Sequence, residues 1–148
     1  MSDGNSVGDD ASASVVPASV VHTIVVDASA VVDLLVNGRP LPTAGALATP
    51  AHLDAEVLSA LGRLHGQGVL TVGDVEEMLE DLVSLPVDRV PIGNLGQQAF
   101  AMRDNVALRD GLYVAVAQAL GCPLSTTDAR LARACADHEL CAVSGSTP

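Results

Sequence analysis

Residues 22–30 read His-Thr-Ile-Val-Val-Asp-Ala-Ser-Ala, and this short stretch decides the fold class. The β-branched run after His22 predicts a strand that is buried on both faces. Asp27 follows the run directly, and the apolar pattern over 28–36 predicts a helix that ends at Gly38. A strand that passes into a helix without a long loop indicates a parallel α/β sheet, and ligands bind at the carboxyl ends of such strands.

Short apolar runs alternate with amphipathic segments along the rest of the chain. We expect further strands at 87–92, 123–126 and 140–143, and helices at 50–65, 71–85, 95–105, 110–120 and 128–137, with a loop over 39–49. Thr49 followed by Pro50 is typical of a helix start, and Thr71 with Asp74 is typical of a capping box. Together these elements predict an α/β fold with a central parallel sheet covered by helices on both faces.

The first 20 residues differ in composition from the rest. Residues 1–20 are rich in Ser, Gly and Asp, which predicts a flexible tail, so the folded domain is expected at 21–148. The tail has neither the basic start nor the apolar run of a signal peptide, and no apolar run of about 18 residues predicts a membrane span. Three cysteines at irregular spacing do not form a disulfide framework. We therefore expect a cytoplasmic protein.

The composition excludes several classes of function. The chain has 148 residues, enough for one domain, and its apolar content of 49% excludes a fully disordered chain. All seven basic residues are arginine, and the absence of lysine excludes a P-loop, a Schiff-base enzyme and the usual phosphoacceptor receiver domain. A net charge of −11 argues against generic binding to nucleic acid or anionic membranes. Carboxylates gathered around a divalent cation remain compatible with that charge.

Four acidic residues lie where a solvated helix face does not explain them. Asp27 and Asp128 follow predicted strands, Asp110 begins a helix, and Glu56 lies at the edge of an apolar helix face. Each has a plain structural alternative, since Asp27 suits a helix N-cap, Asp110 suits a first helical turn, and Glu56 suits a boundary position. Asp54 competes with Glu56 on the same helix. Two strand-end acids on neighbouring parallel strands point to one side of the sheet, which favours a shared site.

Four strings in the chain carry a family resemblance. They are Ile24-Val-Val-Asp-Ala-Ser-Ala30, Pro50-Ala-His-Leu-Asp-Ala-Glu-Val-Leu-Ser-Ala-Leu61, Asp110-Gly-Leu-Tyr-Val-Ala-Val-Ala117 and Leu124-Ser-Thr-Thr-Asp-Ala-Arg-Leu131. In this order and spacing they resemble a PIN-domain ribonuclease, and more narrowly the VapC toxin of a type II toxin–antitoxin pair. The resemblance covers residues 22–144 and implies a PIN-like three-layer α/β/α fold with a projecting helical hairpin.

The resemblance also implies a set of site residues. The implied catalytic and metal-binding carboxylates are Asp27, Glu56, Asp110 and Asp128. Thr126 matches a hydroxyl that usually lies beside the last acid, and Asn105 matches a polar position upstream of the third. The resemblance places the family's glutamate at Glu56 and not at Asp54.

Oxygen ligands favour Mg²⁺, with Mn²⁺ as an alternative, because both are hard cations. The implied activity is metal-dependent endonucleolytic cleavage of tRNA or ribosomal RNA. Arg109 and Arg130 adjoin two of the implied ligands and are candidates for phosphate contacts, although each also suits a solvated helix surface. Two other functions stay open: a PIN-like binding or scaffolding module that has lost cleavage, and a metal-dependent DNA nuclease.

Two other groups of residues have side chains that can bind metal. Cys122, Cys135, His138 and Cys141 lack the tight ligand pairs of a zinc site, and His52 beside Glu56 is not taken as a metal ligand.

The resemblance implies a VapB-like antitoxin and a homodimer. We expect the predicted hairpin of 50–66 and 71–85 to expose apolar residues as an interface. These residues are Leu53, Val57, Leu61, Leu64, Val75, Met78, Leu79 and Leu82.

Overall fold

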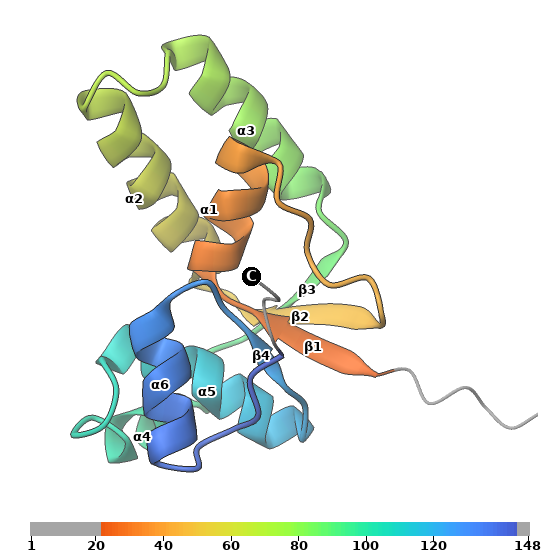
Figure 1. Cartoon of the computed structure of the whole chain (residues 1–148), viewed down its shortest axis with the longest axis vertical. Helices are drawn as coiled ribbons and strands as arrows, with labels where there is room; N and C mark the ends of the chain where they lie inside the picture. Colours follow the sequence, from red (N-terminus) through yellow and green to blue (C-terminus); the bar gives the residue numbers. More distant parts are fainter. Residues whose placement is uncertain (1–21, 145–148) are drawn as a thin grey trace, which may run out of the picture.

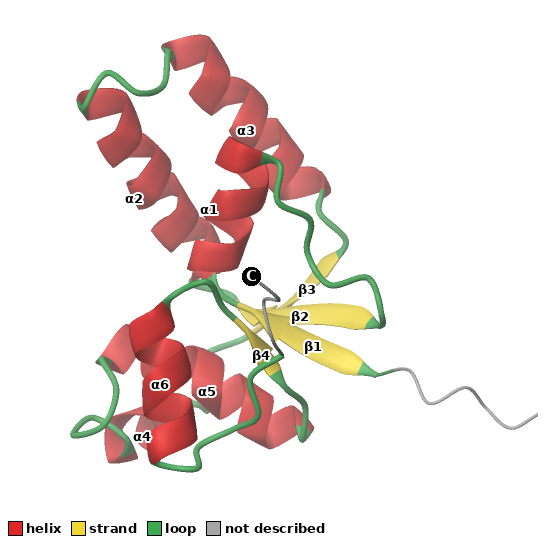
Figure 2. Ribbon diagram, in the orientation of Figure 1, coloured by secondary structure: helices red, strands yellow, loops and turns green. Residues whose placement is uncertain are grey.

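The computed structural model describes residues 22–144, so the expected tail over 1–20 lies outside the described residues. A four-stranded parallel sheet forms the centre (Figure 2). Its strands are β1 (Thr23–Val26), β2 (Ala46–Pro50), β3 (Val87–Val90) and β4 (Leu124–Ser125), in the spatial order β3-β2-β1-β4. Strand β1 is central, because Val25 pairs with Ala48 on one side and with Leu124 on the other.

Helices cover both faces of the sheet, which confirms the predicted three-layer α/β/α architecture. Within the described residues they are α1 (Ala28–Asn37), α2 (Leu53–Gly66), α3 (Val72–Ser84), α4 (Gly96–Ala101), α5 (Leu108–Leu120) and α6 (Ala129–Asp137). Figure 1 shows α1, α2 and α3 on one side of the sheet and α4, α5 and α6 on the other. Helices α2 and α3 run away from the sheet as the expected projecting hairpin.

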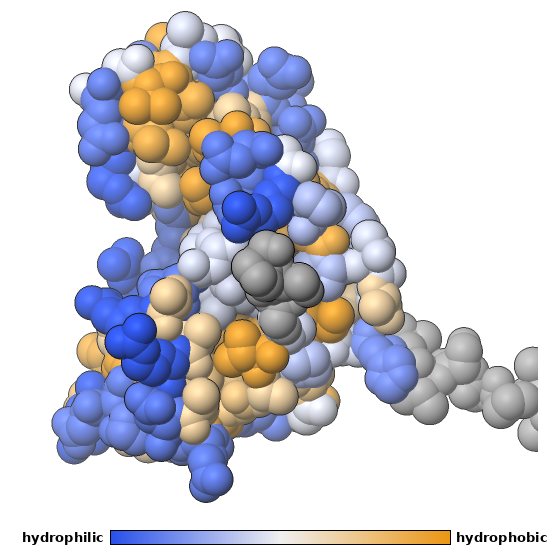
Figure 3. Space-filling view, viewed as in Figure 1, coloured by the Kyte–Doolittle hydropathy of each residue, from blue (hydrophilic) through white to orange (hydrophobic). Residues whose placement is uncertain are grey.

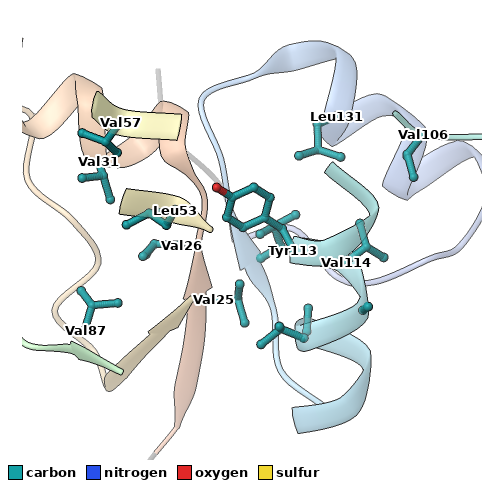
Figure 4. Close-up of a cluster of buried hydrophobic side chains, with 14 of the residues drawn as sticks. Val25, Val26, Val31, Leu53, Val57, Val87, Val106, Tyr113, Val114 and Leu131 are labelled. Carbon is teal, nitrogen blue, oxygen red and sulfur yellow. The ribbon is translucent and has the colours of Figure 1, made fainter. Parts of the chain in front are cut away.

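The hydrophobic core lies between the sheet and these helices. Val25 and Val26 of β1 are fully buried, as are Leu53 of α2 and Tyr113 and Val114 of α5 (Figure 4). Each such side chain contributes roughly 1.5–3 kcal/mol when it leaves water. The core is built almost entirely from Val, Leu and Ala, as a chain with one Tyr and one Phe requires.

Several helix ends form as their residue types predict. Asp27 is the N-cap of α1, and its side chain accepts from the Ala30 amide. Gly38 ends the same helix with a φ of 69°, a left-handed conformation that glycine adopts without strain. The predicted capping box of α3 is present, with Thr71 and Asp74 bonding to each other's backbone amides.

Residues 46–50 correct the sequence interpretation. The expected loop over 39–49 and the expected helix start at Thr49-Pro50 are wrong there, because both residues belong to β2. The Thr49 hydroxyl donates to the Val26 carbonyl oxygen at 2.9 Å, and α2 begins only at Leu53. This segment has weak strand propensity, but β1 and β3 pair with its two edges and tertiary pairing overrides the local signal. Pro50 fits because it is the last residue of the strand.

Smaller differences concern element ends. The expected strand over 140–143 is reduced to a single bridge between Leu124 and Val143. Helix α4 ends at Ala101 rather than near 105, and α5 begins at Leu108, two residues before the predicted start. Among the residues that the structure describes, no helix combines the length and apolar character needed to cross a membrane.

The expected apolar surface on the hairpin is also corrected. Leu53, Val57, Leu61 and Leu82 are buried in the core of this chain. The other four residues of that set, Leu64, Val75, Met78 and Leu79, are partly buried against it. The exposed apolar side chains of the hairpin are instead Leu58, Val69, Val72 and Val83.

An ion pair ties the hairpin to the sheet. Arg89 of β3 donates to both carboxylate oxygens of Asp54 on α2, at 3.3 and 3.1 Å. The same guanidinium donates to the carbonyl oxygens of Leu82, Leu85 and Val87. Asp54, the sequence competitor of Glu56, therefore has a structural partner between two elements.

Candidate active site

The strand order creates a switch point between β1 and β4. The chain leaves β1 through α1 toward β2, whereas β4 pairs with the other edge of β1. Crevices at such points, outside the carboxyl ends of the strands, are the usual ligand sites of open parallel sheets. Asp27 follows β1 directly, and Asp128 follows β4 after two residues. The two predicted strand-end acids thus lie at the same edge of the sheet.

Asp27 is buried and held by hydrogen bonds from two chain segments. Its Oδ1 accepts from the Ser29 hydroxyl at 2.7 Å and from the Ala30 amide at 3.0 Å. Its Oδ2 accepts from the Thr126 hydroxyl, which comes from the β4–α6 junction. Burial raises the pKa of Asp27, the three hydrogen bonds lower it, and the Asp128 charge adds a small further rise, with a net increase.

The same hydroxyls connect the two junctions. Thr126 Oγ1 accepts from the Asp128 amide at 3.0 Å, and Ser29 Oγ accepts from the Thr127 amide at 3.0 Å. Asp128 in turn is the N-cap of α6, and its Oδ1 accepts from the Arg130 amide at 2.8 Å. These bonds fix the start of α1 against the start of α6 and hold both acids at one edge.

A cavity of about 920 Å³ opens at this edge, with walls from α1, α2 and α5 and from the β4–α6 junction. Figure 3 shows the surface hollowed between the part that carries the α2–α3 hairpin and the part that carries α4–α6. All four predicted carboxylates line this cavity: Asp27, Glu56, Asp110 and Asp128. Residues from four different helices or helix starts are therefore brought to one hollow.

The Asp110 carboxyl group is affected by the charges of all three other carboxylates. Burial and the negative charges of Asp128, Glu56 and Asp27, in that order, raise the pKa of its carboxyl group. It lies in the first turn of α5, and Gly111 beside it permits the close approach of α4, since a Cβ there would lie 3.1 Å from the Ala99 carbonyl oxygen. Within residues 22–144 no hydrogen bond holds the Asp110 carboxylate, so its position follows from the packing of α5.

Glu56 is held by side chains distant in sequence. Its Oε2 accepts from the Tyr113 hydroxyl at 2.6 Å, and its Oε1 lies 3.3 Å from the Arg109 guanidinium. The Glu56 side chain is 15% exposed, whereas that of Arg109 is 76% exposed. Figure 4 shows Tyr113 extending from α5 with its hydroxyl toward the side of the molecule where α2 lies.

His52 lies against this pair without joining it by a hydrogen bond. Its ring packs against that of Tyr113 in a tilted arrangement, with 4.8 Å between the ring centroids, and its Nε2 is 3.5 Å from Glu56 Oε2. Burial lowers the pKa of His52 and so favours the neutral imidazole, while the Glu56 charge acts in the opposite direction. Both ring nitrogens are buried and have no hydrogen-bond partner among the described residues.

The structure places the other predicted residues in different parts of the site. Thr126 holds Asp27, as expected for a supporting hydroxyl, and Arg109 lines the main cavity. Asn105 is exposed and lines a second cavity of about 290 Å³, together with Arg130. Asp110 lines both cavities. The predicted residues thus fall into two adjoining hollows that meet at one carboxylate.

Three residues of the site were not predicted from the sequence as participants. Ser29 gave a weak signal by its place two residues after Asp27. Tyr113 lies three residues after Asp110 and so on the same side of α5, and it is the only tyrosine of the chain. His52 lies four residues before Glu56, a spacing that does not by itself indicate a metal ligand. The structure shows it as a packing neighbour of Glu56.

The residue types of the main cavity fit a hard divalent cation. The donors are carboxylate oxygens, and a cation among them would relieve the repulsion that raises the pKa of Asp110. In residues 22–144, no three His, Cys, Asp or Glu side chains stand arranged as a finished metal site. Asp27, Glu56 and Asp128 accept the hydrogen bonds described above, and carboxylate oxygens that accept such bonds keep further lone pairs for a cation.

Comparisons with known proteins show the family and the fold of this chain. The PIN domain profile matches residues 24–137. Ribonuclease VapC3 of Mycobacterium tuberculosis is 47% identical over 127 residues, covering 80% of this chain and 91% of that protein. Ribonuclease VapC12 of the same organism is 35% identical over 119 residues, covering 74% and 90%. The crystal structure of PAE2754 from Pyrobaculum aerophilum has a TM-score of 0.61 and 21% identity over 76% of this chain and 79% of that one, a likeness of fold.

Proposed function

The chain belongs to the VapC ribonucleases of the PIN-domain family, and from this premise we propose that it is the toxin of a type II toxin–antitoxin pair. Its proposed activity is metal-dependent endonucleolytic cleavage of tRNA or ribosomal RNA. The observation that carries the proposal is the convergence of Asp27, Glu56, Asp110 and Asp128 on one cavity at the carboxyl edge of the sheet.

We propose Asp27, Asp110 and Asp128, with Glu56, as the residues that hold Mg²⁺ or Mn²⁺. When bound, such a cation lowers the pKa of a water molecule and offsets negative charge on a phosphodiester. The hydroxyls of Ser29 and Thr126 keep Asp27 oriented toward this edge.

Arg109 has a proposed role at the rim of the cavity. Its exposed guanidinium now pairs with Glu56, and it would also reach an RNA phosphate at the mouth of the hollow. A charge-assisted contact of this kind compensates for the net charge of −11, which otherwise repels RNA. Arg130 is proposed as a second phosphate contact, on the other side of Asp110.

The proposal includes partners and a location. The proposed protein partner is a VapB-like antitoxin, which membership of the VapC ribonucleases implies. The exposed apolar side chains Leu58, Val69, Val72 and Val83 support a homodimer or an antitoxin contact on the hairpin. The cytoplasm is the proposed location because tRNA and ribosomal RNA are found there.

The test is cleavage by the purified chain. We expect tRNA or ribosomal RNA to be cut with Mg²⁺, not in excess chelator, and single-stranded DNA of equal length to stay intact. Asp128→Asn should abolish cutting, whereas Asp137→Asn, at the exposed end of α6, should not. Cutting of DNA instead of RNA would favour the DNA nuclease. Absence of cutting on every RNA, with the protein folded, would favour a binding module.

A further inference from the structure

The second cavity adjoins the proposed catalytic centre. It has a volume of about 290 Å³ and lies between the segment 103–107 that precedes α5 and the first turns of α6. Asp110 lines it as well as the main cavity, so the two hollows share one carboxylate. A polymer bound across the main cavity therefore lies next to the second one.

Arginines line this second hollow. Arg103 and Arg130 both face it, in a chain with only seven basic residues. Within residues 22–144 no carboxylate forms an ion pair with Arg130, and its side chain is exposed. Its positive charge acts on the Asp110 carboxylate without a direct contact, so its guanidinium keeps its hydrogen-bond donors for an anion, although the protein as a whole is strongly acidic.

An exposed aromatic ring contacts Arg103, one of the residues that line this hollow. Phe100 is the only phenylalanine of the chain and is 56% exposed. The Arg103 guanidinium stacks over its ring at 4.6 Å and donates to the Phe100 carbonyl oxygen at 3.1 Å. Proteins that bind single strands combine cationic grooves with exposed aromatic rings on which bases stack.

We propose that the second cavity is a subsite for a nucleotide of single-stranded RNA, next to the phosphodiester that is cut. Arg130 and Arg103 hold the phosphate in this subsite, and a base stacks on Phe100. The inference rests on the proposed ribonuclease function. It adds the residues that hold one nucleotide beside the phosphodiester that is cut.

The experiment measures binding rather than cleavage. The full chain carrying Asp27→Asn, which is expected not to cut, is titrated with a labelled single-stranded RNA of about 12 nucleotides and followed by fluorescence anisotropy at several salt concentrations. Arg130→Gln is the test variant. Arg133→Gln is its matched control, because Arg133 is an exposed arginine of the same helix that lines neither cavity.

We expect Arg130→Gln to weaken binding by about three- to tenfold and to reduce the slope of log K against log salt by about 0.7. Arg133→Gln should change affinity by less than about twofold. Phe100→Leu keeps an apolar side chain but removes the ring, so binding should weaken by about fivefold or more with the salt slope unchanged.

Four results would overturn the subsite. Equal losses for Arg130→Gln and Arg133→Gln would show a general charge effect. An unchanged affinity for Phe100→Leu, with a change in sedimentation, would make this face a protein interface. Absence of RNA binding by the parent chain would remove the subsite and the proposed function together. If wild-type protein cuts RNA while the two arginine variants bind equally well, only the subsite fails.

Discussion

Asp27 and Glu56 line the same cavity, yet they are held by different kinds of partner. Asp27 is buried at a strand-to-helix junction, where Ser29, the Ala30 amide and Thr126 satisfy its two oxygens. Two of these three donors lie within three residues of it in the sequence. Its position is therefore fixed largely by the local chain path from β1 into α1.

Glu56 has no such local support. The Tyr113 hydroxyl and the Arg109 guanidinium hold it, and both come from α5, more than fifty residues away in the sequence. Arg109 is mostly exposed, so solvent screens its contribution. The Glu56 end of the cavity thus depends on how α2 and α5 dock, whereas the Asp27 end depends on one junction. We expect substitutions at the two ends to differ in size and in kind.

The largest effect is expected from Asp27→Asn. Loss of one metal-binding charge should lower the cleavage rate by about 1000-fold or more. Stability at pH 7 should stay level or rise, because the ionised carboxylate is disfavoured by burial. RNA cleavage and urea unfolding measure the two quantities, with Asp137→Asn as the control. An unfolded Asp27→Asn protein would make this residue a structural cap alone.

An intermediate effect is expected from Thr126→Val, which removes the hydroxyl that donates to Asp27. Cleavage should fall by about 10-fold or more, since a hydrogen bond to a charged group is worth about 1.5–3 kcal/mol. That bond lowers the pKa of Asp27, so its loss should move the acid limb of the rate profile to higher pH.

Thr49→Val is the matched control for Thr126→Val. It also removes a buried hydroxyl, but one that donates to the Val26 carbonyl oxygen and touches no carboxylate. We expect it to lower stability without moving the pH profile of cleavage. If both variants leave that profile in place, the hydroxyl of Thr126 does not tune Asp27.

A smaller effect is expected from Tyr113→Phe at the other end. It removes the hydroxyl that donates to Glu56 and keeps the ring in the core. Because Arg109 still pairs with Glu56, cleavage should fall by only about fivefold, the value of a net hydrogen bond near 1 kcal/mol. In a Glu56→Gln background the same change should have no further effect. An additive loss in the double variant would show that Tyr113 does not act through Glu56.

The smallest expected difference between wild type and Asp27→Asn is in how the free energy of unfolding depends on pH. Asp27 has a folded-state pKa above its ordinary 3.8, so the folded protein binds its proton more tightly than the unfolded chain does. Its contribution to stability is present at low pH and is lost as the pH rises above about 4. Urea unfolding from pH 4 upward should therefore show a steeper fall for wild type than for Asp27→Asn. Parallel curves for the two proteins would contradict the raised pKa.

The contrast between the local support of Asp27 and the tertiary support of Glu56 also explains which site residues the sequence predicts. Asp27 and Asp128 are readable because each follows a predicted strand directly or within two residues, and the order of parallel strands then places both at one edge. Glu56 was not separable from Asp54 by periodicity. The choice depends on Arg89 pairing with Asp54, a contact across 35 residues that no local pattern encodes.

Strand β2 and Tyr113 were missed for a related reason. Residues 46–50 have little strand propensity, and they form β2 because two neighbouring strands pair with them. The sequence predicts the helix that carries Tyr113, but the Tyr113 hydroxyl meets Glu56 only because α5 packs beside α2. Local sequence patterns predict the strand-to-helix junctions of the sheet. Strand β2 and the contact between Tyr113 and Glu56 depend on tertiary packing.

The most direct test of the shared carboxylate centre is a Mg²⁺ titration of RNA cleavage by wild type and Asp110→Asn. Asp110 caps no helix and its carboxylate accepts no hydrogen bond within the described residues, and burial and three neighbouring carboxylates disfavour its charge, so Asp110→Asn should have little structural cost. We predict a wild-type rate that rises with Mg²⁺ and saturates, and an Asp110→Asn protein that is at least as stable yet cuts no RNA at any Mg²⁺ concentration. Wild-type cleavage by Asp110→Asn at saturating Mg²⁺ would contradict the account.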